Sequence, residues 1–414
     1  MLYHELHHKL REIFTNTVPE IVDEELGISI NNVKFESIGA RGVLAGCKSL
    51  ECLEHQTIFE TSDEEQYSES KKALDIPDYF IKENLSYTIS VIKNIETEVA
   101  DELIILFHGL NEKKWDKYLP WAYELVKKSN CAVMLYPISF HMDRAPEQWS
   151  DRQLMFKVSN HRAQDLNENS DSSYVNAAIS TRMETHPQRM FWSGLQSYND
   201  VIQIIDDVKA GKFSYINKDC KLNLFGYSIG SFLSVILMMA NPKGIFDDSK
   251  LFCFCGGMTI DRMFPISKYI MDARAAIAMQ KVFAQLLTTN FNSDFRLGHY
   301  QDENLHPGES WFKTMLRYNH FQQEREDRFK ELEGKIKAFV LEQDVVAPPI
   351  EALNTLKGGY RSIKIDIEIA DYEFPYSHVV PFPLTTKNGE EVTAAFKKMI
   401  KSAVKFYKKK KKEN

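Results

Sequence analysis

The residues with the clearest chemical meaning form the pattern G-x-S-x-G, which runs from Gly226 through Ser228 to Gly230. The run 221–225 before it has the character of a buried strand, and the apolar run 231–240 after it has that of a helix. On such a strand-to-helix turn, the glycines let the two segments approach closely, and the serine hydroxyl projects outward at a helix N-terminus. The pattern alone is weak, because glycine and serine are common in turns. Its context predicts that Ser228 is a nucleophile.

A serine hydroxyl becomes reactive when an imidazole takes its proton and a carboxylate orients that imidazole. Asp344 follows an apolar, strand-like run and precedes a helical one. His378 is the only histidine after Asp344, and it lies in a loop beyond the last predicted strand. We therefore predict a catalytic triad of Ser228, Asp344 and His378.

The acid of this triad has an alternative. Asp261 lies just after the strand-like run 251–255, and Asp344 could merely cap the helix that follows it. Acyl transfer also needs donors for the developing oxyanion, and the backbone N–H of Ile229, after the nucleophile, is one candidate. Three histidines precede Asp344 in a helical segment and are expected in packing or at the surface: His299, His306 and His320.

The elements around these residues alternate beyond residue 100. Short apolar runs that predict parallel strands are separated by amphipathic stretches that predict helices. The predicted strands cover residues 103–107, 131–136, 221–225, 251–255, 336–341 and 363–369. The predicted helices cover residues 118–128, 197–209, 231–240, 345–356 and 390–407. The first 100 residues are expected to supply one or two helices and an antiparallel strand near 83–94.

Two stretches interrupt this rhythm. Residues 138–190 are polar and too long for an ordinary connection, which predicts an insertion. Residues 258–330 are rich in methionine, phenylalanine and alanine, and they predict a helical cap. We expect residues 1–80 to pack as an extension on a domain that spans 81–414. Apolar cap residues suggest an acyl pocket, although core packing is an equal alternative: Met258, Met263, Phe264, Met271 and Phe283.

The order of strand, His108-Gly109-Leu110, helix, strand, G-x-S-x-G turn, late aspartate and later histidine resembles the α/β-hydrolase superfamily. The resemblance covers roughly residues 80–410 and is closest to serine esterases and lipases. It implies an α/β fold with a mostly parallel central sheet flanked by helices. It also implies that the backbone N–H of Leu110 is the second oxyanion donor and that Gly109 allows the tight turn.

Four further residues are candidates for substrate binding. His108 and Tyr227 adjoin the predicted site, and His141 and Arg144 lie where the insertion leaves the sheet. His108 could instead form hydrogen bonds within its own loop. The arginines of the insertion could instead belong to a structural network with nearby acids, namely Asp143, Asp151, Asp165 and Asp171.

The predicted function is that of a serine hydrolase that cleaves a carboxylic ester or thioester of a small acyl substrate through an acyl-enzyme, without a cofactor. A peptidase or an acyltransferase would use the same triad. A catalytically silent relative that binds a partner through its insertions, or a protein whose lysine-rich end dominates its function, are alternatives from other classes.

Charge and composition narrow these classes. The net charge of −7 argues against a general nucleic-acid-binding protein. Residues 397–414 hold nine lysines and one glutamate, and the run Lys408–Lys412 could make weak contact with an anionic surface. A solvated helix end is the favoured interpretation of that run.

The cysteines and the remaining histidines suggest neither disulfides nor a metal. Cys131, Cys220, Cys253 and Cys255 lie in or beside predicted strands, as expected of core residues in a reducing compartment. The chain opens without a secretory signal, so a cytoplasmic protein is expected. The segment 4–8, His-Glu-Leu-His-His, matches the zinc motif H-E-x-x-H, but no third ligand is evident, and we predict no metal site.

Overall fold

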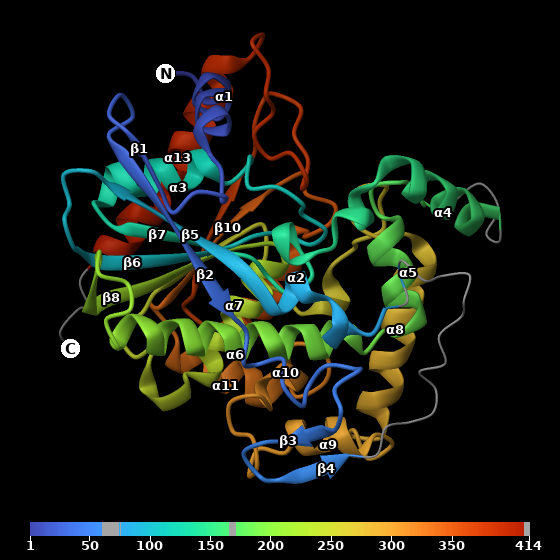
Figure 1. The fold of residues 1–414 in the computed structure, drawn as a ribbon. Coiled ribbons are helices and arrows are strands. Elements are labelled where there is room, and N and C mark those ends of the chain that lie inside the picture. Colours follow the sequence, from blue (N-terminus) through green and yellow to red (C-terminus); the bar gives the residue numbers. More distant parts are fainter. Residues whose placement is uncertain (60–73, 75, 165–170, 410–414) are drawn as a thin grey trace.

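A computed structural model describes residues 1–59, 74, 76–164 and 171–409 of the chain. Its centre is a nine-stranded sheet in the order β1-β2-β5-β7-β6-β8-β9-β10-β11 (Figure 1). The strands are β1 (Glu20–Asp23), β2 (Ile28–Glu36), β5 (Ser86–Asn94), β6 (Ala100–Phe107), β7 (Ala132–Tyr136), β8 (Ile216–Tyr227), β9 (Leu251–Phe254), β10 (Ile336–Leu341) and β11 (Asp366–Ala370). The six strands from β7 to β11 in this order run parallel, whereas β5 is antiparallel to both of its neighbours.

The central strands are buried on both faces, because helices cover each side of the sheet. All five residues of β7 and all four of β9 are buried, which explains their continuous apolar sequences. One face packs against α1 (Tyr3–Ile13), α3 (Leu119–Ser129) and α13 (Gly389–Lys408). The other packs against α6 (Arg189–Lys209), α7 (Ile229–Ala240) and α12 (Pro349–Leu356). Figure 1 shows these two layers above and below the sheet.

The insertion and the first helix of the cap lie at one end of the molecule, whereas the last two cap helices pack against α7 and α12. The insertion contains α4 (Arg152–Gln164) and α5 (Ala177–Thr185), and the cap contains α8 (Ala273–Thr288), α9 (Phe295–Gln301), α10 (Trp311–Thr314) and α11 (Gln322–Glu331). Helices α5 and α8 lie side by side (Figure 1), and Arg162 of α4 joins Glu184 of α5 to Asp272, the N-cap of α8. A two-stranded hairpin, β3 (Leu50–Cys52) and β4 (Thr57–Phe59), lies beside α9.

The first 80 residues contribute more to the sheet than the sequence suggested. Both β1 and β2 precede residue 81, and β2 pairs with β5 over its full length of nine residues. The sheet therefore continues across the predicted domain boundary. The alternation in β2 was obscured because Asn31 and Asn32 are adjacent polar residues in the middle of the strand.

The remaining elements are short, and they connect the larger ones. They are α2 (Lys82–Leu85) and the 3-10 turns η2 (Asp78–Phe80), η3 (Met142–Arg144), η4 (Glu147–Ser150), η6 (Pro242–Gly244) and η7 (Ile260–Arg262). Within the described ranges, no helix combines the length and the apolar character needed to cross a bilayer.

Candidate active site

Ser228 lies on the turn between β8 and α7 in a backbone conformation that few side chains adopt, with φ +55° and ψ −119°. The two glycines make this turn possible. A Cβ on Gly226 would lie 2.6 Å from the Cα of Ser231, and a Cβ on Gly230 would lie 2.6 Å from the carbonyl oxygen of Phe107. Because both obstacles are backbone atoms, they could not yield, so the strand and the helix can approach only at glycine. The turn therefore holds Ser228 at the N-terminus of α7.

The three residues of the predicted triad lie in one hydrogen-bonded chain. The Oγ of Ser228 lies 2.7 Å from Nε2 of His378, and Nδ1 of His378 lies 2.7 Å from Oδ2 of Asp344. All three side chains are buried. A carboxylate can only accept, so Asp344 fixes the proton of His378 on Nδ1 and leaves Nε2 free to accept the proton of Ser228.

The Asp344 carboxylate is itself held in place by the backbone. Its Oδ1 accepts hydrogen bonds from the N–H groups of Val346 and Ala347, both at 2.9 Å, while Oδ2 faces His378. Asp344 thus orders the turn before α12 and contacts the histidine at the same time. Asp261, the alternative acid, faces elsewhere, since its carboxylate accepts from the Thr259 hydroxyl and the Tyr318 N–H.

Tyr227 contacts His378 through a hydrogen bond and through its ring. Its hydroxyl donates to the carbonyl oxygen of His378, and the two rings stack with an interplanar angle of 18° and a centroid distance of 5.5 Å. Tyr227 is itself buried and also lines the pocket above Ser228. Tyr227 therefore contacts both the backbone and the ring of His378 and also adjoins the pocket.

Of the two predicted oxyanion donors, Leu110 lines the pocket of Ser228, and Ile229 is the first residue of α7. In the described part of the chain, the backbone N–H groups of Leu110 and Ile229 donate to no acceptor. The loop that carries Leu110 is held by Gly109, whose N–H donates to the Tyr118 hydroxyl at 2.9 Å. A Cβ on Gly109 would lie 3.0 Å from the Tyr227 ring, which explains why glycine occupies this position.

His108 and Arg144 do not reach the pocket, which corrects the expectation that they could bind substrate. Nδ1 of His108 donates to the Gly109 carbonyl, and its Nε2 accepts from the Ile138 N–H. Burial lowers the pKa of His108 well below its usual value, so the ring is neutral and holds two loops together. Arg144 is fully buried in an ion pair with Asp200 at 2.9 Å.

The other arginines of the insertion also serve packing, but with partners different from those expected. Arg182 and Arg189 both pair with Asp78, and Arg162 pairs with Asp272 and Glu184. These arginines thus form ion pairs within the fold, and among the described residues their partners are not Asp143, Asp151 or Asp171. Asp143 accepts a hydrogen bond from Asn16, and Asp165 lies outside the described residues.

His141 occupies a different cavity from Ser228. Its Nδ1 lies 2.9 Å from the Ser139 carbonyl, and within the described ranges its buried Nε2 has no hydrogen-bond partner. Burial lowers its pKa to about 4. The cavity of His141 adjoins the Ser228 pocket, because Asn111, Glu112 and Lys113 line both.

The pocket above Ser228 has a volume of about 480 Å³, within the range of small-molecule sites. Its apolar wall consists of Leu110, Val175, Ile270, Val379 and Leu384. The predicted acyl-pocket residues do not line it. Met258, Met263, Met271 and Phe283 are buried in the core, and Phe264 is exposed. The cap contributes Tyr269 and Ile270 instead.

Asn111 is a residue of the site that the sequence analysis missed. Its side-chain amide donates to the carbonyls of Tyr269 in the cap, at 2.8 Å, and of Val175 in the insertion, at 3.1 Å. Asn111 has φ +60°, a conformation that asparagine tolerates better than most residues. Its place directly after His108-Gly109-Leu110 was the available signal.

The strand order from β2 to β11, with β5 antiparallel and a nucleophile elbow after β8, defines an α/β-hydrolase fold, as the sequence predicted. The chain belongs to a protein family of unknown function, DUF6051, whose sequence model matches residues 1–408. No functionally curated protein matches the sequence.

Solved structures that resemble the chain include several esterases. Carboxyl esterase 2 from the mycorrhizal fungus Tuber melanosporum is 14% identical, with a TM-score of 0.41 over 78% of this chain and 81% of that one. A thermostable esterase from Pseudomonas putida ECU1011 is 12% identical, with a TM-score of 0.42 over 98% and 90%. Esterase LipW from Mycobacterium marinum is 11% identical, with a TM-score of 0.41 over 78% and 79%.

Proposed function

We propose that the protein is a serine hydrolase that cleaves a carboxylic ester or thioester through an acyl-enzyme on Ser228. The observation that carries this proposal is the hydrogen-bonded chain from Ser228 through His378 to Asp344, with 2.7 Å at each step. Ser228 and His378 line a pocket that is large enough for a small molecule. Most buried, hydrogen-bonded side chains serve only the stability of the fold. Packing alone does not explain, however, why a serine is held at φ +55° beside an imidazole.

In the first half of the reaction, Nε2 of His378 takes the proton of Ser228 as Oγ attacks the acyl carbon. Asp344 stabilises the imidazolium that forms and keeps its ring oriented. The N–H groups of Leu110 and Ile229 would donate to the oxyanion of the tetrahedral intermediate. His378 then gives the proton to the departing alcohol or thiol, and the acyl group remains on Ser228.

In the second half, a water molecule enters where the leaving group was. His378 removes its proton, the hydroxide attacks the acyl carbon, and the second tetrahedral intermediate releases the carboxylic acid and returns the proton to Ser228. These steps require no metal or organic cofactor.

The pocket favours a small acyl substrate with an apolar part. Aliphatic side chains line part of the pocket, and its charged lining includes Lys113, Lys114 and Lys117 together with the acids Glu112 and Asp116. Lys117 pairs with Glu112 and lies 5.1 Å from the centroid of the Tyr227 ring, so it is already partly neutralised. We therefore expect the acyl chain to contact the aliphatic wall.

A fluorophosphonate probe tests the proposal directly, since it labels only a serine that a neighbouring base activates. Labelling should be lost in Ser228→Ala and retained in Ser193→Ala, whose hydroxyl donates to the Met190 carbonyl on α6. A wild-type protein that is folded yet unlabelled would contradict the proposal and favour a silent binding protein. p-Nitrophenyl esters of graded chain length, run beside a thioester and an arylamide, would then separate esterase, thioesterase and peptidase activity.

A further inference from the structure

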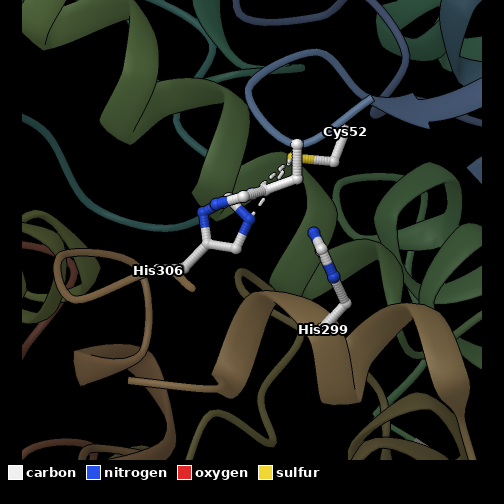
Figure 2. A group of neighbouring side chains, drawn as sticks. Cys52, His299 and His306 are labelled. Atoms are coloured by element: carbon white, nitrogen blue, oxygen red, sulfur yellow. Dashed lines mark hydrogen bonds between the residues drawn. The ribbon is translucent and has the colours of Figure 1, made fainter. Parts of the chain in front are cut away.

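One thiol and three imidazoles lie together far from Ser228 in the sequence and outside its pocket. They are Cys52 and His55 of the β3–β4 hairpin, and His299 and His306 of the cap. One ligand atom of each side chain lies within 4.8 Å of every other. Figure 2 shows the side chain of Cys52 on the hairpin, with His299 and His306 directed toward it from the cap.

We infer that these four residues form a closed, structural zinc site that fastens the β3–β4 hairpin to the cap. The sulfur of Cys52 lies 3.4 Å from Nδ1 of His55 and 3.4 Å from Nε2 of His306. In a tetrahedral zinc site with Zn–S near 2.3 Å and Zn–N near 2.05 Å, the S···N edge is about 3.5 Å. The observed spacing therefore suits ligands around one ion.

The hydrogen bonding of the cluster by itself is incomplete. Nε2 of His299 is buried and has no hydrogen-bond partner among the described residues, and His299 and His306 are both almost fully buried. An unpaired buried nitrogen destabilises a protein, whereas a metal would use its lone pair. Thiolate and imidazole are also the donors that zinc prefers, and four protein ligands leave no position open for a catalytic water.

The surroundings of His306 support this assignment. Its Nε2 faces Cys52, while its Nδ1 lies 3.6 Å from a carboxylate oxygen of Glu309 and 3.9 Å from one of Glu54. Zinc-bound histidines commonly present their other ring nitrogen to a carboxylate, which fixes the tautomer and increases the basicity of the ligand. The ring of Tyr300 packs against His306, and that of Phe59 against His299, so aromatic side chains shield the cluster.

The local fold supplies a reason for such a site. In the part of the chain that the structure describes, strands β3 and β4 have three residues each and pair only with one another. So short a hairpin is not stable by itself. A metal that takes two ligands from the hairpin and two from the cap would hold these segments together. Binding would release the thiol proton of Cys52 to solvent, because the thiolate is the ligand.

The experiment uses the full chain purified without metal-affinity chromatography. Elemental analysis after dialysis should find about one zinc per chain. After removal of the zinc by a chelator, Co²⁺ should bind at one equivalent, with a thiolate-to-metal charge-transfer band and the intense visible bands of a tetrahedral ion. Cys52→Ser should abolish the charge-transfer band, and His299→Ala should prevent stoichiometric binding. Cys47→Ser is the matched control, since that thiol lies outside the cluster and donates to the Ala40 carbonyl.

Two further variants sharpen the test. Glu309→Gln should keep the stoichiometry but weaken Zn²⁺ binding about 10- to 100-fold. His378→Ala should leave the metal content unchanged, whereas loss of metal in this variant would place the ion at the second donor group, Cys255, Asp344 and His378. The Co²⁺ titration of the wild-type chain needs no variant, so it is decisive even if Cys52→Ser fails to fold. A wild-type chain that binds neither Zn²⁺ nor Co²⁺ stoichiometrically, or binding that persists in folded Cys52→Ser and His299→Ala, overturns the inference.

Discussion

The Asp344→Asn substitution offers a sharp test of the proposed mechanism. The N–H groups of Val346 and Ala347 both point at Oδ1, so only the oxygen of an asparagine amide could accept them. Its NH₂ group would then face Nδ1 of His378, which would have to accept a hydrogen bond. The ring proton would move to Nε2, and the imidazole would lose the lone pair that receives the Ser228 proton. The backbone around Asp344 therefore dictates the inactive tautomer.

The size of the effect follows from this inversion. A triad with the wrong tautomer loses about 10⁴-fold in kcat, which corresponds to about 5 kcal/mol of transition-state stabilisation. We expect a loss of this order for a p-nitrophenyl ester at pH 7, with the rate of fluorophosphonate labelling reduced in parallel. Thermal unfolding should change little, since asparagine preserves the shape and both backbone hydrogen bonds.

Asp261→Asn is the matched control and should leave kcat unchanged, because Asp261 lies outside the hydrogen-bonded chain. The reasoning would be refuted if Asp344→Asn kept kcat within about tenfold of the wild type, or if Asp261→Asn caused the larger loss.

Three further predictions concern stability and access to the pocket. Gly230→Ala should destabilise the fold by about 3 kcal/mol, because the new Cβ would lie 2.6 Å from the Phe107 carbonyl oxygen. Gly298→Ala should be neutral or slightly stabilising, because the nearest neighbour of its Cβ would lie at 3.4 Å. Equal melting temperatures for the two variants would contradict this prediction. Burial lowers the pKa of His141 to about 4, so as the pH falls the unfolded chain binds this proton before the folded protein does. The free energy of unfolding should therefore fall by up to about 3 kcal/mol as the pH drops from about 6.5 to 4. In His141→Gln, urea unfolding should depend less on pH, and an unchanged dependence would contradict this prediction. Asn111→Gly keeps the positive φ but removes one tether to the cap and one to the insertion, so KM should rise more than kcat falls. A loss confined to kcat would assign Asn111 to the chemistry.

Much of the fold could be predicted from the sequence because local and global signals agree there. The buried strands and the helices between them have distinct periodicities, and the G-x-S-x-G turn after β8 fixes the place of Ser228 along the sheet. Chain order then led to Asp344 and His378, which the structure places in hydrogen-bonding contact with each other and, through His378, with Ser228. Their catalytic roles stay a prediction.

The features that escaped prediction depend on partners far apart in the sequence. Arg144 pairs with Asp200 rather than with its neighbour Asp143, because the buried carboxylate on α6 is the one that the fold brings to it. The cluster around Cys52 could not be predicted for the same reason. Its two halves are separated by more than 240 residues, and neither half by itself matches a metal-binding pattern. Which cap residues face the pocket is likewise decided by packing and not by composition.

The two ends of β8 face different surroundings. At its carboxyl end the chain turns into Ser228, while Lys221 in the first half of the strand, together with Lys250 just before β9, donates to the terminal carbonyls of α13. These ammonium groups neutralise the negative C-terminal end of α13, and they hold Lys408, its last residue, at the edge of the sheet opposite Ser228. Because Lys408 lies at the opposite edge of the sheet from Ser228, a surface attached at Lys408 would leave the mouth of the pocket turned toward solution.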